Sequence, residues 1–211
     1  MNYKHLNLPP NPIKTTFDMN SILPELIKRS GEKAGYVEYN PNEVLTAEVL
    51  QIFESVDLLP SIAIMFCVPL PRSKDLALIH SDVESIRHTA WKKVVCSVNW
   101  ELTPNVSPKF SWYETTRKPV MPEKRCLSRE DIKLFGIHYE NRRQFGFYPN
   151  HDTLIESVNT NTGALLVRTD IPHSIEIDDT SPEFRFAISV RFKNKMQSWD
   201  DAVELFKPLI Q

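Results

Sequence analysis

The sequence predicts a mainly β protein with the architecture of a double-stranded β-helix, the jelly-roll or cupin-like barrel, and flanking helices. Eight or so short apolar or alternating segments follow one another after Pro60. Long helices do not alternate with these segments, which disfavours a parallel βαβ sheet. The chain has 211 residues, a length that fits one domain with a substantial core. We therefore expect a single domain over 1–211, with its barrel at 61–193.

The two ends of the chain predict additions to this barrel. Residues 1–40 read as an extended arm with one short helix around 19–29. The strongest helix is expected at 42–56, where apolar residues recur at helical spacing and Asn42 is placed to cap it. This helix is expected to cover one face of a sheet. A C-terminal helix is expected at 198–207, because Ser198 and Asp201 match a capping box.

The strands of the barrel are predicted from period-two alternation and from β-branched runs. The clearest alternation places Val94, Cys96, Val98 and Trp100 on one side of a strand. Residues 117–130 form a charged loop, for which a solvated face and a lid over the site are both open interpretations. Residues 131–141 fit a helix and a strand equally well, and a turn is expected at 159–163. The expected strands are 61–70, 75–80, 92–102, 109–115, 153–158, 163–169 and 183–193.

Composition excludes several classes of protein. The net charge is −2 and no basic stripe is present, so nucleic-acid binding is not expected. Five glycines and the absence of a Gly-x-Gly-x-x-Gly or Walker motif exclude the common phosphate loops. No stretch approaches the roughly 20 apolar residues of a membrane helix, and no apolar signal region is visible. Because Cys67, Cys96 and Cys126 form no Cys-x-x-Cys pair, we expect reduced thiols and a cytoplasmic location. Oligomeric state stays open.

The residues that carry chemistry are His80, Asp82 and His173. Side chains two apart in a strand point to the same face, so the His-x-Asp pair can share one site. His173 follows Pro172, which restricts how the chain approaches it. Two imidazoles and one carboxylate form the facial set that holds non-haem iron(II) and leaves three positions open. Asp170 is a weaker candidate for the carboxylate, and a His-x-Asp tripeptide alone can also be structural.

A positively charged residue, Arg185, follows the third residue of the triad in the sequence. Arg185 opens the strand-like run 185–192, and its planar guanidinium matches a carboxylate at two points. This arrangement predicts an acidic co-substrate that chelates the metal at one end and binds arginine at the other. Arg191 is a rival for this role, because it shares a strand face with Arg185. Further polar residues predicted to line the co-substrate pocket are Ser189, Ser97 and Asn99. Weaker candidates for contact with substrate or co-substrate are Tyr113, through its hydroxyl, and His138, at the mouth of the site.

Taken together, the His-x-Asp pair, the distal histidine and the arginine-led strand resemble the iron(II)/2-oxoglutarate-dependent dioxygenases, with prolyl- and aspartyl-hydroxylase-like members nearest. The resemblance covers about 76–192. It implies that His80, Asp82 and His173 hold Fe(II) and that Arg185 binds the distal carboxylate of 2-oxoglutarate. It further implies an oxidoreductase that uses O2 to hydroxylate a small-molecule, amino-acid or peptide substrate, with release of succinate and CO2.

Two other interpretations remain open at the level of the sequence. One is a non-catalytic jelly-roll binding module, which would have no need of a cation at Arg185. The other is a cupin-type metalloenzyme that does not use 2-oxoglutarate. Such enzymes commonly carry a His-x-His pair, whereas residue 82 of this chain is aspartate.

Overall fold

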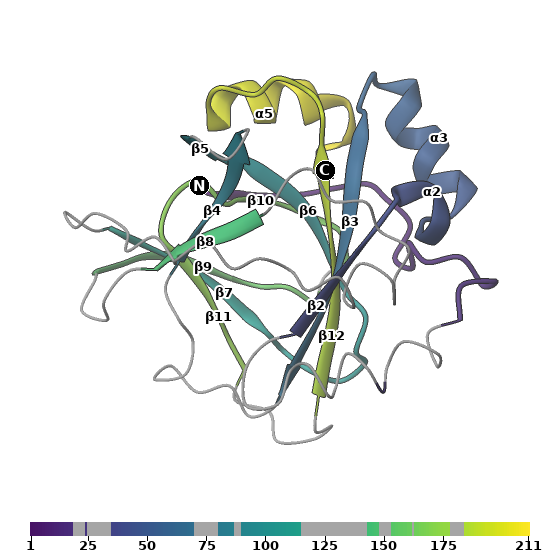
Figure 1. The fold of residues 1–211 in the computed structure, drawn as a ribbon, viewed down its shortest axis with the longest axis horizontal. Helices are drawn as coiled ribbons and strands as arrows, with labels where there is room; N and C mark the ends of the chain where they lie inside the picture. Colours follow the sequence, from purple (N-terminus) through teal and green to yellow (C-terminus); the bar gives the residue numbers. More distant parts are fainter. Residues whose placement is uncertain are drawn as a thin grey trace.

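The computed structural model describes residues 1–18, 24, 35–69, 80–86, 90–114, 143–147, 153–161, 163–177 and 184–211. These residues form two antiparallel sheets and a few helices (Figure 1). The mainly β fold class is therefore confirmed. Among the described residues, no helix is both long and apolar enough to cross a membrane.

The larger sheet has six strands in the order β1-β10-β6-β12-β3-β2. Its strands are β1 (Tyr3–His5), β10 (Leu165–Arg168), β6 (Cys96–Glu101), β12 (Phe184–Phe192), β3 (Pro60–Pro69) and β2 (Gly35–Tyr39). The second sheet has the order β5-β4-β11-β7-β9, and β8 also pairs with β4. Its strands are β5 (Ala90–Lys93), β4 (His80–Ile86), β11 (His173–Glu176), β7 (Lys109–Glu114), β9 (Thr153–Asn159) and β8 (Arg143–Phe147).

Most expected strands are present with ends shifted by a few residues. The strand expected at 75–80 meets the described structure only at His80, where β4 begins. The strand expected at 92–102 is two strands in different sheets. Val94 and Val95 lie between β5 and β6. Their backbone groups bond elsewhere, because Val94 donates to the Asp82 carbonyl (3.0 Å) and Val95 accepts from Thr169 (2.9 Å). The chain therefore crosses from one sheet to the other at this point. The predicted arm also contributes β1 and β2, and β8 was not predicted.

The helix expected at 42–56 is divided into α2 (Pro41–Val44) and α3 (Ala47–Ser55). Leu45 is extended and forms a β-bridge with Ile13, which interrupts the helical hydrogen bonds. The first cap is Asn40 rather than Asn42, since the Asn40 side chain accepts from the backbone of residue 42. Thr46 starts the second helix by accepting from the backbone N–H of Val49. The prediction was therefore right about helical content and wrong about continuity.

The cap of α3 gives a modest, testable contribution to stability. Replacing Thr46 with alanine removes the acceptor for the Val49 N–H (3.3 Å), and we expect a loss of about 1 kcal/mol in the free energy of unfolding. Urea denaturation followed by circular dichroism measures this change. Thr46→Ser keeps the acceptor and should stay close to the parent protein. An alanine variant as stable as the serine variant would contradict the assignment of this cap.

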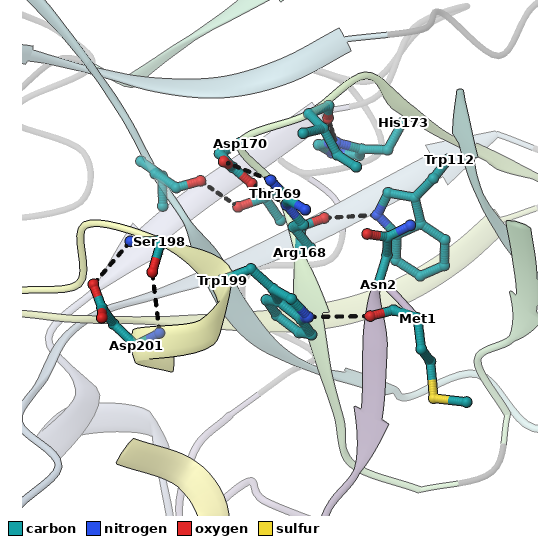
Figure 2. Close-up of polar contacts among 12 residues, drawn as sticks. Met1, Asn2, Trp112, Arg168, Thr169, Asp170, His173, Ser198, Trp199 and Asp201 are labelled. Carbon is teal, nitrogen blue, oxygen red and sulfur yellow. Dashed lines mark hydrogen bonds and ion pairs between the residues drawn. The ribbon is translucent and has the colours of Figure 1, made fainter. Parts of the chain in front are cut away.

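At the C-terminus, the expected helix is confirmed as α5 (Trp199–Phe206), followed by the 3-10 turn η1 (Lys207–Leu209). The predicted capping box forms: the Ser198 hydroxyl accepts from the backbone of Asp201, whose carboxylate accepts in return from Ser198 (Figure 2). The helix expected near 19–29, the segment 75–79 and Cys126 lie outside the described residues.

The main hydrophobic core lies on one face of the larger sheet, under the helices. Alternate residues of β6 and β12 point to this face and pack against α3 and α5, which flank the larger sheet in Figure 1. Within β6 the predicted alternation is confirmed, since Cys96, Val98 and Trp100 are all buried in this core, but it fails before the strand begins, because Val95 rather than Val94 joins them there. A smaller cluster joins the opposite face of the larger sheet to the second sheet, and it consists of Phe110, Trp112, Leu165 and Val167. That opposite face, called the inner face below, carries the arginines and the polar residues of the candidate site, and it faces the second sheet.

Candidate metal centre

His80, Asp82 and His173 lie together in the structure. One potential ligand atom from each residue is within 4.8 Å of the others. The Oδ1 atom of Asp82 is 3.9 Å from Nε2 of His80 and 3.8 Å from Nε2 of His173. The centroids of the two imidazole rings are 4.4 Å apart. The arrangement predicted from the sequence is thus present, and the three side chains can serve one metal ion.

Two strands of the second sheet create this convergence. His80 and Asp82 are alternate residues of β4 and therefore point to the same face. His173 is the first residue of β11 and is paired directly with His80. Directly paired residues of antiparallel strands also share a face, so the second histidine joins the first pair. Pro172 precedes it, and its carbonyl accepts from the Tyr113 backbone (2.9 Å), which fixes the entry to β11.

His173 is held in the form that a metal requires. Its Nδ1 is 2.9 Å from the Ile171 carbonyl, and because a carbonyl only accepts, this contact places the ring proton on Nδ1. The lone pair is then on Nε2, which faces Asp82. The ring stacks on Phe110 with centroids 5.0 Å apart. Burial, and secondarily the neighbouring His80, holds the pKa of His173 well below its ordinary value. The imidazole is therefore neutral, the state in which it binds metals.

Asp82 is fixed through both its backbone and its side chain. Its N–H donates to the Thr169 carbonyl (2.8 Å), and its carbonyl accepts from Val94 (3.0 Å). The Thr169 hydroxyl donates to the Val94 carbonyl (2.7 Å), within the β10–β11 connection that Figure 2 shows beside His173. The second carboxylate oxygen, Oδ2, forms an ion pair with Nη2 of Arg191. One oxygen thus faces the imidazoles while the other faces a guanidinium.

The two arginines occupy different surroundings on the inner face. Arg191 is buried beside Asp82, and burial lowers its pKa to about 9, opposed by the carboxylate of Glu38. It therefore remains a cation at neutral pH. Arg185 lies six residues earlier on β12, and its Nε donates to Oε2 of Glu101 (2.6 Å). Burial raises the pKa of Glu101, and the nearby Arg185 opposes that shift. This ion pair uses only one of the five guanidinium donors.

A row of buried polar side chains lies between these ion pairs. Ser189 on β12 is paired with Asn99 on β6, and Ser97 shares the face of Asn99. Four buried atoms on this face have no hydrogen-bond partner among the described residues: Ser97 Oγ, Asn99 Oδ1, Ser189 Oγ and Arg191 Nε. An unsatisfied buried polar atom costs about 1–3 kcal/mol. Such a row is typical of a surface that receives a polar ligand or ordered water.

Other candidates from the sequence are not brought to the triad. The Tyr113 hydroxyl contacts Glu176 (2.7 Å) and Ser174 (3.0 Å), and Ser174 follows His173 on β11, so it lies on the other face of that strand. The rival carboxylate Asp170 is paired with Arg168 (2.7 Å). His138 and the loop 117–130 lie outside the described residues.

Sequence reasoning missed three residues that complete this site, namely Glu38, Glu101 and Thr169. Glu101 had a usable signal, because it continues the alternation of Ser97 and Asn99 along β6. Glu38 and Thr169 had none, since each reaches the site through a pairing between segments distant in the sequence. Their positions follow only from the way in which the two sheets meet.

Comparison with known proteins adds no relative. No protein-family model matches the sequence, and a search of curated proteins finds no match. The site itself is therefore the evidence for function.

Proposed function

We propose that this protein is an iron(II)/2-oxoglutarate-dependent dioxygenase with a jelly-roll fold. Its substrate would be a small molecule, an amino acid or a peptide, which it hydroxylates with release of succinate and CO2. The observation that carries the proposal is the convergence of His80, Asp82 and His173 beside a buried inner face with two arginines and a row of unsatisfied polar atoms.

The donor set fits iron(II). Two neutral imidazoles and one carboxylate are the ligands of the facial triad in non-haem iron oxygenases, and they leave three coordination positions for other ligands. A softer metal would favour thiolate, but Cys96 lies in the main core on the other face of β6. Iron(II) bound to the triad would supply the activation of O2. The contribution of the protein would be to bind, orient and exclude water around it.

The inner face supplies groups for an acidic co-substrate. Among the described residues, Arg185 uses one of its five guanidinium donors, in the bond to Glu101, and with the others it would bind the distal carboxylate of 2-oxoglutarate. The hydroxyl of Ser189 lies on the same face, between Arg185 and Arg191 along β12, and would donate to the co-substrate. Asn99 and Ser97 would line the neighbouring wall. A bound co-substrate would give the unsatisfied polar atoms of Ser189, Asn99 and Ser97 hydrogen-bond partners, and this would remove the free-energy cost of burying them.

One observation favours a second candidate, a metalloenzyme that does not use 2-oxoglutarate. Arg185 already forms a buried ion pair with Glu101, and this pair can exist for structural reasons alone. In that case, the protein would bind the metal at the triad and would leave Arg185 out of ligand binding. The two candidates differ in whether 2-oxoglutarate joins the metal.

Anaerobic titration separates the two candidates. Iron(II)-loaded protein should develop a weak visible charge-transfer band on addition of 2-oxoglutarate, because the keto acid chelates the metal. Folded, iron-loaded protein that gives neither this band nor 2-oxoglutarate-dependent succinate would contradict the dioxygenase and favour the second candidate. Screening amino acids and peptides for substrate-stimulated succinate formation would then identify the substrate class.

Replacing Arg185 with lysine should weaken 2-oxoglutarate binding about tenfold or more, while leaving iron affinity unchanged. Lysine can still pair with Glu101, but it lacks the planar fork that binds a carboxylate at two points. The measurement is the 2-oxoglutarate concentration that half-saturates the charge-transfer band. Arg168→Lys is the matched control, since Arg168 is paired with Asp170 outside the proposed pocket. Equal 2-oxoglutarate affinities in both variants would exclude Arg185 as the anchor.

A further inference from the structure

We infer that Arg191 is a positioning residue that restricts Asp82 to binding the metal through Oδ1 alone. The inference rests on the metal site of the proposed function and is independent of 2-oxoglutarate. A carboxylate can bind a metal through one oxygen or through both. Which of these occurs at Asp82 decides how many positions of the metal remain open for other ligands.

The two oxygens of the Asp82 carboxylate have different partners. Oδ1 of Asp82 lies within 4 Å of Nε2 of both histidines, whereas Oδ2 accepts from Nη2 of Arg191. An oxygen that accepts a charged hydrogen bond has less electron density to offer a metal, and the guanidinium also occupies the space beside it. Asp82 would therefore present a single oxygen to a metal held by the triad, which would leave three positions open for other ligands.

Arg191 is itself held in place by neighbouring residues. Nη1 of Arg191 donates to the Thr169 hydroxyl (3.3 Å), and the Thr169 carbonyl accepts from the Asp82 backbone (2.8 Å). The same threonine thus contacts both partners of the ion pair. Glu38, which is buried on β2, balances the charge of Arg191 electrostatically. The guanidinium is therefore fixed relative to the backbone of Asp82, and its direction determines which oxygen faces the histidines.

A purely structural salt bridge between the two sheets is the competing explanation. It would make Arg191 important for stability, but substitution would leave the coordination of a bound metal unchanged. A positioning role instead predicts a change in the number of oxygens that Asp82 supplies. The two explanations therefore differ in a spectroscopic property of the metal rather than in activity.

Cobalt(II) is a suitable probe, because its visible absorption reports coordination number and geometry. We expect Arg191→Met to lower cobalt(II) affinity about 10- to 100-fold, the usual effect of losing an outer-shell partner, and to alter the cobalt spectrum as Oδ2 becomes available. Arg191→Lys retains the charge but cannot contact Asp82 and Thr169 together, so its affinity should be intermediate and its spectrum altered. Arg185→Lys, with an arginine replaced on the same strand and face, should match the parent protein in both measurements.

The outcomes separate this inference from the proposed function. If the parent protein binds no cobalt(II) or iron(II), the metal site and the proposed function both fail. If the parent binds cobalt(II) and a folded Arg191→Met variant keeps the same affinity and spectrum, only the positioning role is overturned. Should Arg191→Met not fold, Arg191→Lys decides in the same way: a spectrum and affinity equal to those of the parent overturn the inference, and altered values support it.

Discussion

His173→Ala should lower iron(II) affinity by well over 100-fold and abolish the charge-transfer band with 2-oxoglutarate. Loss of an outer-shell partner of a metal ligand already costs about 10- to 100-fold in affinity, and His173 is one of the three direct donors. Among the described residues no further ligand is placed to replace it, because its ring is flanked by His80, which already belongs to the triad, by Phe110 and by its own backbone segment. Equilibrium dialysis measures the affinity, and visible absorption measures the band.

Two further variants separate loss of a ligand from loss of packing. His173→Gln keeps a polar side chain in the buried position and should also lose the band, because an amide is a poor iron ligand. His5→Ala removes a histidine of β1, outside the triad, and should bind iron as the parent protein does. A His173→Ala variant that folds and binds iron within a few-fold of the parent would refute the metal site.

Phe53→Ala should lower the free energy of unfolding by about 3–5 kcal/mol, the cost of removing a large aromatic side chain from a core. Phe53 has no exposed surface and packs from α3 against the larger sheet. Its ring lies 5.1 Å from that of Phe192 and 6.5 Å from that of Trp100, both edge-to-face. Domains of this size are stable by only about 5–15 kcal/mol, so this single change removes a large share of the total.

Urea denaturation measures the effect of Phe53→Ala. Leu59→Ala is the control, since Leu59 is 56% exposed and its loss should change stability by no more than about 0.5 kcal/mol. The fraction of Phe53→Ala that remains folded should bind iron with unchanged affinity, because the larger sheet separates Phe53 from the triad. A loss of stability below about 1 kcal/mol would contradict the assignment of this core.

Period-two alternation explains what the sequence could predict. It places His80 and Asp82 on one face of β4, and it separates Val98 from Asn99 on β6, with the first in the core and the second on the inner face. Alternation is a local property of the backbone and needs no knowledge of the partner strand. The candidate ligands and most strands therefore follow from the sequence directly.

The remaining features depend on contacts that a local pattern does not contain. The division of the predicted strand at Val94 reflects bonds to residues 82 and 169, which come from other parts of the chain. The break between α2 and α3 reflects the pairing of Leu45 with the N-terminal arm. Likewise, alternation placed Arg185 and Arg191 on the same face but could not show that one pairs with Glu101 and the other with Asp82.

The separation of the main core from the inner face affects which amino-acid substitutions this protein can tolerate. The main hydrophobic core lies between the larger sheet and its helices, whereas the site lies between the opposite face of that sheet and the second sheet. Substitutions at inner-face positions such as Ser97 or Asn99 therefore exchange one polar lining for another without opening a cavity under α3 and α5. The architecture allows the specificity of the site to diverge, by mutation or by design, at little cost to folding.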